Sequence, residues 1–207
     1  KVFLYPEHWL EPEWRDDKTP FFEELEAQLL QNEIGTEQAE KAYMDYLLKL
    51  EAVSNMEIMA ICEAETVANV VSGYYIFGRT YGEPKELYFR KYTIRTGSFS
   101  AWERIEVGFE GDHLLPAMHK GKLHLFWPVL EEKTEPQNPD QEGRYDASTP
   151  NRSVKIAWCS FYNRKWSGKK VTNEYIESNS ETIYLKYEND RVILYKNGRT
   201  AELNFYF

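Results

Sequence analysis

The spacing of the apolar positions changes near residue 56. Before that point apolar residues recur every three or four positions, as on one face of a helix, and after it they alternate with polar residues over short stretches, as in strands. The pattern therefore predicts a mainly β chain with an N-terminal helical pair. We divide it into a strap and helical lead-in at residues 1–56 and a β domain at residues 57–207.

Two helices are expected in the lead-in. Thr19 can cap the first helix, and Pro20 can stand in its first turn, where a missing N–H costs no hydrogen bond. Gly35 is expected to end this helix, and Thr36 to cap the second. The second helix has apolar residues three and four positions apart, with Glu and Lys on the far side: Ala39, Ala42, Tyr43, Tyr46, Leu47, Leu50 and Val53.

The β domain reads as a series of strands with short links, and Asn197-Gly198 is a strong signal for a tight hairpin. Successive tight hairpins make an antiparallel meander, and a four-strand meander is the unit of a propeller blade. The polar, Pro-containing stretch 132–152 is expected to be a mobile loop. The candidate strands are 57–63, 72–79, 86–93, 101–107, 113–119, 122–131, 153–161, 165–171, 181–187, 191–196 and 200–206.

A weak internal repeat supports this geometry. Residues 74–107 resemble residues 123–172, and the hairpins "FSAWERIEV" and "NRKWSGKKV" make Trp102 equivalent to Trp166. Residues 181–207 are a partial third copy. Because a closed propeller needs about four or more blades, the alternatives are an incomplete ring, an open β-assembly and a sandwich.

Composition excludes some function classes. The net charge is −9, with acidic and basic residues interspersed, so no basic stripe for nucleic acid is expected. Cys62 and Cys159 stand among apolar neighbours and are expected to be reduced core residues. No apolar run is long enough to span a membrane. The chain begins at Lys1 without an initiator Met, which we interpret as part of a longer protein.

The turns that carry the two tryptophans resemble the Asp boxes of sialidases, S-x-D-x-G-x-x-W, but lack the Asp and the Gly. We expect them to stabilise blades. A glycosidase needs two carboxylates about 5–10 Å apart, and a sialidase adds an arginine cluster and a Tyr nucleophile. Strand alternation scatters the candidates over both faces, so no catalytic residue is expected among Glu103, Glu106, Glu110, Asp112, Arg79, Arg90 and Arg104.

His113, His119 and His124 are close enough in sequence to suggest a metal site. No Cys or carboxylate spacing completes a zinc set, so neither a metal nor another cofactor is expected. The histidines could still titrate within an interface.

Several segments together resemble the TcA-type subunit of bacterial insecticidal Tc toxin complexes. They are "VFLYPEHWLEPEWRDDKTPFFEELEAQLLQNEI", "TEQAEKAYMDYLLKLEAVSNMEI", "YIFGRT", "WERIEVGFEGDHLLPAMHKGKLHLFWPV" and "VKIAWCSFYNRKWSGKKV". The likeness is collinear over nearly all of residues 2–172. It covers the neuraminidase-like region of that subunit and the helical segment before it.

The resemblance implies a function. In the family the subunit is a homopentamer with a pore-forming channel inside a shell, and a shift in pH opens the shell. A TcB–TcC cocoon, bound through other regions, delivers the toxic enzyme. For this chain it implies a non-enzymatic shell module of neuraminidase-like type, in a secreted or bacterial cell surface-associated toxin complex. Contact with a membrane would then involve only other parts of the full-length protein.

The resemblance also assigns a role to the segment before the first helix. That strap would run from the large helical shell domain of the family onto the β domain, pinned by aromatic residues and a salt-bridged latch. The structural or interface candidates are Trp9, Trp14, Arg15, Asp16, Asp17, Lys18, Trp102 and Trp166.

A second hypothesis remains open. The β domain could be a degenerate sialidase that binds a carbohydrate or host receptor through exposed aromatic rings, since sugars stack on aromatic faces. Its candidates are Tyr81, Tyr145 and Tyr162.

Overall fold

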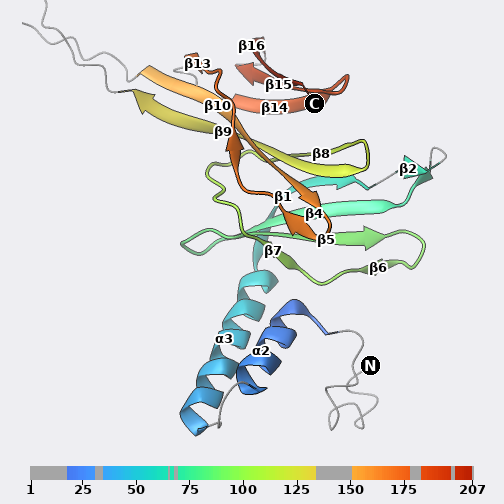
Figure 1. The fold of residues 1–207 in the computed structure, drawn as a ribbon, viewed down its shortest axis with the longest axis vertical. Helices are drawn as coiled ribbons and strands as arrows, with labels where there is room; N and C mark the ends of the chain where they lie inside the picture. Colours follow the sequence, from blue (N-terminus) through green and yellow to red (C-terminus); the bar gives the residue numbers. More distant parts are fainter. Residues whose placement is uncertain are drawn as a thin grey trace, which may run out of the picture.

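The computed structural model describes residues 18–30, 35–64, 66–67, 70–133, 151–177, 183–196 and 199–206. Helices lie at one end of the molecule, and three β-sheets follow one another toward the other end (Figure 1). Several residues singled out in the sequence lie outside the described ranges: Trp9, Trp14, Arg15, Asp16, Asp17, Tyr145 and the Asn197-Gly198 turn.

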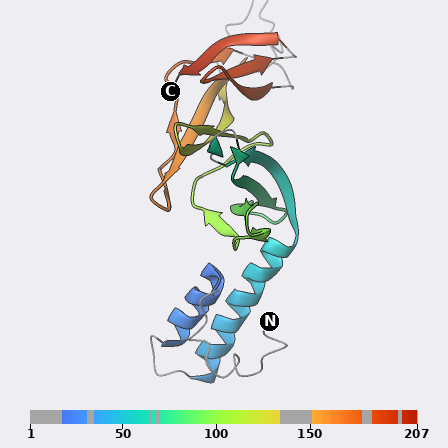
Figure 2. The same ribbon diagram turned by 90° about the vertical axis from the view of Figure 1, so that its right-hand side faces the viewer.

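The predicted helical pair consists of α2 (Pro20–Leu30) and α3 (Thr36–Ser54), which lie side by side in both views (Figures 1 and 2). The rings of Phe22 and Tyr46 meet edge to face, with centroids 6.3 Å apart. Ala42 is buried against α2. The pair is therefore held by few apolar contacts, and much of α3 faces away from α2.

The predicted cap of the first helix is confirmed, because the Thr19 hydroxyl accepts the Phe22 N–H at 3.3 Å. At the second helix the prediction is wrong by one residue. Gly35 is the N-cap, with extended backbone (φ −77°, ψ 154°), and Thr36 is already the first helical residue. A capping residue must lie outside the helical conformation, so the Thr36 hydroxyl cannot take that position.

The first sheet has the strand order β1-β4-β5-β6, with β7 also paired to β5. All of its pairs are antiparallel. A short hairpin of β2 (Thr66–Val67) and β3 (Val70–Val71) stands beside it. The bounds are β1 Met56–Glu63, β4 Gly73–Thr80, β5 Leu87–Thr93, β6 Ser98–Phe99 and β7 Glu103–Ile105.

The second sheet has the order β11-β10-β9-β8, with β12 and β13 also paired to β10, and the third sheet has the order β14-β15-β16. Their pairs are antiparallel as well. The bounds are β8 Leu115–His119, β9 Lys122–Lys133, β10 Asn151–Tyr162, β11 Lys165–Trp166, β12 Lys170–Val171, β13 Ile176–Glu177, β14 Ile183–Glu188, β15 Arg191–Lys196 and β16 Arg199–Tyr206.

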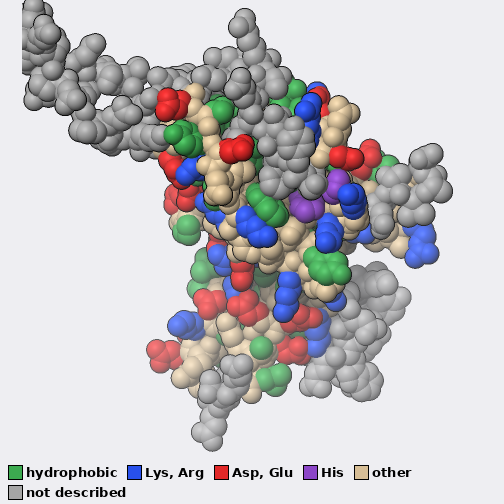
Figure 3. Space-filling model, turned by 45° about the horizontal axis from the view of Figure 1, so that its top comes forward, with side chains coloured by type: hydrophobic (Ala, Val, Ile, Leu, Met, Phe, Trp, Pro, Cys, Tyr) green, Lys and Arg blue, Asp and Glu red, His purple; other side chains and the backbone are tan. Residues whose placement is uncertain are grey.

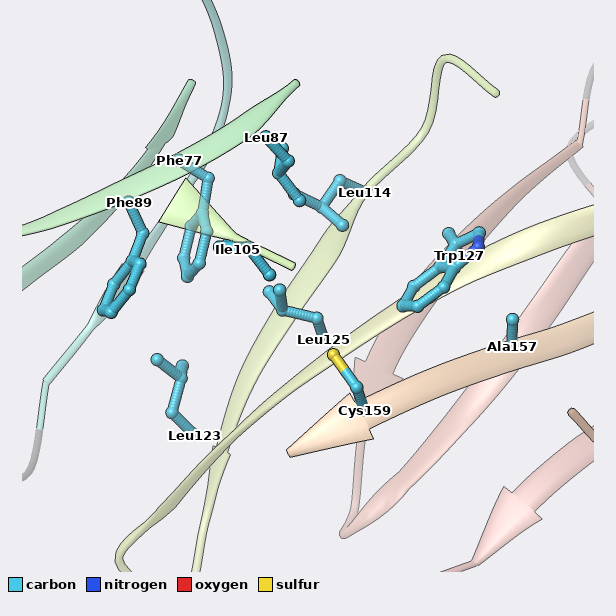
Figure 4. Packing of buried hydrophobic residues seen from close by; sticks show 10 residues of the cluster. All are labelled: Phe77, Leu87, Phe89, Ile105, Leu114, Leu123, Leu125, Trp127, Ala157 and Cys159. Carbon is cyan, nitrogen blue, oxygen red and sulfur yellow. The ribbon is translucent and has the colours of Figure 1, made fainter. Parts of the chain in front are cut away.

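The second sheet is buried on both faces. Side chains alternate between the faces of a strand, so Leu125 and Trp127 of β9 face the first sheet, whereas Phe126 faces the third. Figure 4 shows the first interface, where Phe77 and Phe89 meet the second sheet. A separate cluster fills the second interface: Ala117, Phe126, Val154, Ile156, Leu185, Val192 and Leu194.

The first two sheets repeat one another strand by strand, which confirms the internal repeat seen in the sequence. Phe77 pairs with Phe89 across β4 and β5, and Phe126 pairs with Trp158 across β9 and β10. The alignment of "YYIF" with "LHLF" is therefore also the structural one.

The predicted equivalence of Trp102 with Trp166 is wrong. Phe99 pairs with Tyr92 as Trp166 pairs with Phe161, so Trp166 corresponds to Phe99. By the same count Trp102 corresponds to Lys169. Matching the two tryptophans therefore misaligns the two hairpins by three residues.

The fold class is confirmed: the chain is mainly β with an N-terminal helical pair and antiparallel, blade-like meanders. The third copy expected at residues 181–207 is the three-stranded third sheet. In the described part of the chain, no strand of the third sheet pairs with the first, so the sheets form an open assembly. Strands β9 and β10 extend to Lys133 and from Asn151, and residues 134–150 of the expected loop lie outside the described ranges.

Candidate functional site

The closest aromatic contacts between the first two sheets gather around Trp166. Its ring centroid lies 4.9 Å from that of Phe161 in the same sheet and 5.2 Å from that of Phe89 in the first sheet. Phe89 and Phe161 are themselves 5.1 Å apart. Trp166 is thus a wedge between two sheets, and its contacts hold them at a fixed spacing.

Beside these rings, serine hydroxyls accept hydrogen bonds from backbone N–H groups where strand pairing ends. Ser167 donates its N–H to the Ser160 carbonyl at 2.8 Å, and its Oγ accepts the Ser160 N–H at 3.0 Å. Ser100 makes the same two bonds with Lys91, at 2.8 and 2.9 Å. The hydroxyl replaces a backbone carbonyl, so the strand turns away without leaving an N–H unpaired.

Two threonines use the same arrangement. Thr172 makes both bonds with Ile156, and Thr80 makes both with Glu86, all at 2.9–3.1 Å. Sequence analysis missed all four hydroxyl residues. For the two serines the available signal was an aromatic residue followed by Ser and a small residue, "FSA" and "WSG", at matching positions of the repeat.

Trp102 lies on the outer face of the first sheet, the face turned away from the second sheet. The guanidinium carbon of Arg90 lies 4.4 Å from the Trp102 ring centroid and 4.2 Å from that of Phe99. Phe99 in turn lies 4.8 Å from Tyr92. Burial lowers the pKa of Arg90, and among the described residues no carboxylate pairs with it.

Arg79 of β4 binds both β1 and the loop between β7 and β8. Its side chain is only 8% exposed and contacts Glu57 of β1 at 2.7 Å, Asp112 at 2.8 Å and the Gly111 carbonyl at 2.8 Å. Burial opposes its charge, but the bonds to both carboxylates keep the Arg79 pKa above its ordinary value. The hydrogen bond from Arg79 correspondingly lowers the pKa of Asp112. This cluster is built to hold a loop in place.

The three arginines considered for a sialidase site do not converge. Arg79 lies on the face toward the second sheet, whereas Arg90 and Arg104 lie on the outer face. Arg104 pairs with Glu86 at 2.7 Å.

The carboxylates considered with them are also dispersed. Glu103 stands opposite Phe89, Glu106 and Glu110 are exposed, and Asp112 is held by Arg79. Within the described ranges, no three or more His, Cys, Asp or Glu side chains are placed to hold a metal ion.

The three neighbouring histidines lie where the second sheet meets the third. The His113 Nε2 accepts the Leu185 N–H of β14 at 2.9 Å, and burial lowers the pKa of His113. His119 lies 3.3 Å from the Tyr187 hydroxyl and 3.5 Å from the Asp190 carboxylate. His124 stacks on Phe126 at 6.1 Å between ring centroids, and burial lowers its pKa as well.

Two hollows bear on binding. One of about 540 Å³ is lined by residues that include Cys62, Glu63, Lys120 and Tyr187. Burial raises the pKa of the Cys62 thiol to about 12, so it is not a nucleophile at neutral pH. The other, of about 310 Å³, lies between α3 and the β4–β5 turn and includes the exposed Tyr81.

Of the charged strap candidates Arg15, Asp16, Asp17 and Lys18, only Lys18 lies in the described residues. Its ammonium group contacts the Glu26 carboxylate of α2 at 2.8 Å, and both side chains are largely buried. Lys18 therefore ties the residues before α2 to the second turn of that helix. Over the face drawn in Figure 3, acidic and basic side chains are interspersed.

The fold and the dispersed charged groups define a class: an open, neuraminidase-like β-assembly, with no convergent catalytic set among the described residues. The chain belongs to the family of the neuraminidase-like domain, whose model matches residues 56–205. Residues 1–26 match the ABC toxin N-terminal region. No helix in the described ranges is long and apolar enough to cross a membrane.

The chain is similar to part of a toxin subunit. Toxin subunit YenA2 of Yersinia entomophaga is 27% identical in an alignment 195 residues long, which covers 87% of this chain and 14% of YenA2. This chain thus spans a small part of its relative. The match confirms the resemblance to the TcA-type subunit.

Two solved structures share the fold. Morganella morganii TcdA4 has a TM-score of 0.64 at 18% identity, over 96% of this chain and 9% of TcdA4. Yersinia pseudotuberculosis TcaA-TcaB has a TM-score of 0.52 at 18% identity, over 84% of this chain and 9% of the matched chain.

Proposed function

We propose that this chain is a non-enzymatic structural module in the shell of a TcA-type, pore-forming toxin translocation subunit. It would contribute to subunit assembly and to pH-dependent opening of the shell. The observation that carries the proposal is the sheet buried on both faces and wedged by Trp166, in a family whose relatives are toxin subunits. A stack of this kind is a rigid wall element.

The longer protein would be a secreted or bacterial cell surface-associated homopentamer that binds the TcB–TcC cocoon through other regions. The direct test is assembly of the full-length subunit with Trp166→Ala, compared with Tyr162→Ala at the exposed end of β10. We expect electron microscopy to find complete shells for the Tyr162 variant and few for the Trp166 variant. Equal yields of shells would contradict the proposal.

A non-enzymatic role is supported by the separate bonding of Arg79 and Arg104, each of which is already paired with carboxylates. We expect the chain to release no fluorophore from a fluorogenic sialoside. Turnover that is lost on Arg90→Ala but kept on Arg95→Ala would instead establish a sialidase.

A latch at the strap is the second element of the proposal. The Lys18–Glu26 pair supports a tie between the strap and α2. We expect Asp16→Asn with Asp17→Asn in the full-length subunit to shift the pH dependence of pore formation, because two acidic groups would no longer titrate. An unchanged profile would rule the latch out.

A second candidate function is binding of a host glycan or receptor. The observation that favours it is Tyr81, 63% exposed at the rim of a hollow that also contains Asn55 and Glu83. Tyr162 is less suited, because the Lys122 ammonium already lies over its ring at 5.1 Å. A glycan array with the wild type and Tyr81→Ala tests this function, and specific binding lost in the variant would support it.

A further inference from the structure

Among the described residues, much of the outer face of the first sheet is apolar and exposed. Ile61 is 59% exposed and Phe99 53% exposed, and Ile58 and Tyr74 on the same face are also exposed. The helix pair covers only one end of this face, where Phe21 packs on Tyr88. Exposed apolar patches of this kind mark interaction surfaces.

The internal repeat shows what such a face does elsewhere in the chain. By strand register, Tyr74 and Ile76 correspond to Leu123 and Leu125 of the second sheet. In the second sheet this face is at most 2% exposed at both leucines, because the first sheet covers it. The outer face of the first sheet therefore occupies the position of a contact face in the stack.

The equivalent faces of the first and second sheets differ in charge at one position of the repeat. Arg90 stands where the second sheet has Cys159, which is fully buried. The Arg90 guanidinium is held against Phe99 and Trp102, and its Nε is buried without a hydrogen-bond partner in the described part of the chain. A cation fixed in this way among apolar groups fits a partner that presents a carboxylate beside apolar side chains.

The chain carries a surface with that chemistry on α3. At 100° per residue, one face of α3 contains Tyr43, Met44, Leu47 and Leu48, and all four are more than half exposed. Glu40 and Glu51 project from the same face. The side of α3 that meets α2 is distinct, and there Lys49 pairs with Glu24.

We propose that α3 of one copy docks on the outer face of the first sheet of a second copy. The apolar side chains of α3 would cover Ile61 and Phe99, and Glu40 or Glu51 would pair with Arg90. Because the two surfaces are different, each copy can bind one neighbour through α3 and another through the sheet. Such heterologous contacts produce rings or open chains of subunits. The contact deepens the assembly role proposed above.

The test is self-association of the 207-residue chain, measured by analytical ultracentrifugation at concentrations up to about 1 mM, which detects an interface with a Kd of about 1 mM. We expect a series of oligomers larger than a dimer. A chain that stays monomeric, or that stops at a dimer, would overturn the proposal. Shell formation by the full-length subunit is tested separately with Trp166→Ala. A chain that stays monomeric would therefore contradict this contact without contradicting the proposed function.

Charge reversal identifies the surfaces. We expect Arg90→Glu to weaken association at least tenfold, and a matched reversal at the exposed Arg95, Arg95→Glu, to change it less than twofold. Combining Arg90→Glu with Glu40→Arg and Glu51→Arg should restore association. Circular dichroism and thermal melts check that each variant is folded.

The following results would contradict the proposed contact between α3 and the first sheet. Equal effects of Arg90→Glu and Arg95→Glu, or no recovery in the combined variant, would overturn the pairing. Covalent cross-links from residue 61 that reach residues other than those of α3 in a second copy would do the same, since another occupant would then cover the sheet.

Discussion

Trp166 meets Phe89 edge to face across two different sheets, with ring centroids 5.2 Å apart and ring planes at 88°. Removing this ring empties the space between the sheets, so we expect Trp166→Ala to lower the free energy of unfolding by about 3 kcal/mol. Trp102→Ala is the matched control, because Trp102 packs on the outer face and is expected to cost about 1 kcal/mol. Urea unfolding of both variants measures the difference, and equal costs would mean that Trp166 does not join the sheets.

The hydrogen bonds that the Ser167 and Ser100 hydroxyls accept from backbone N–H groups can be tested with a second pair of variants. Ser167→Ala leaves the Ser160 N–H without its acceptor, so we expect a loss of about 1 kcal/mol and faster hydrogen exchange at the Ser160 amide. Ser100→Ala removes the same bond at an exposed position, where water can replace the hydroxyl, and should cost less. Ser167→Thr should retain the bond. Wild-type exchange at Ser160 in Ser167→Ala would contradict this account.

Acid is expected to loosen the third sheet. Burial lowers the pKa of His113 below its ordinary value of about 6.5, so the unfolded chain binds the proton more readily. The stability contribution of neutral His113 is complete above pH of about 6.5 and is lost as the pH falls toward the folded pKa. Its Nε2 would then lose the Leu185 N–H but could donate to the Leu185 carbonyl at 3.2 Å, which offsets part of the loss.

His113→Gln separates the protonation of His113 from the protonation of other groups, because glutamine can accept the same hydrogen bond but does not titrate. We expect the pH dependence of hydrogen exchange at Leu185 to become flatter in this variant. A titration of the His113 ring by NMR reports the pKa directly. A value at or above that of a free histidine would contradict the assignment.

The two cysteines should differ in reactivity from exposed thiols. Burial raises the pKa of Cys62 and Cys159 to about 12, so almost no thiolate is present at neutral pH. We expect slow modification by a thiol reagent in the folded chain and fast modification of both in urea. Cys62 should react before Cys159, because it lines the 540 Å³ hollow and Cys159 is fully buried. The variant Cys62→Ser isolates the slower thiol.

Much of the fold could be predicted because its signals are local. The switch from helical spacing to alternation near residue 56 coincides with the junction of α3 and β1. Turn residues separate strands that pair with their neighbours in sequence, so a meander follows almost without long-range information. The two cysteines also lie where the apolar strand pattern places them: Cys159 is in the core and Cys62 packs against it.

The site required information that the sequence pattern lacks. Trp102 and Trp166 look alike in sequence, but they differ in register by three residues. The face of the first sheet that carries Trp102 is an outer face, whereas the equivalent face of the second sheet, which carries Trp166, packs against the first sheet. The hydrogen bonds of the serine hydroxyls depend on where a strand leaves its ladder, which is set by pairing across the sheet. Arg90 becomes notable only when its counterpart is known to be the buried Cys159.

A sheet that is covered on both sides also determines how the molecule comes apart. The buried central parts of β9 and β10 cannot meet solvent until a neighbouring sheet has detached, so opening has to start from an end of the stack. The amides in the centre of these two strands should be the last to exchange with deuterium. A force or pH change that acts on a terminal sheet would then detach the sheets one after another.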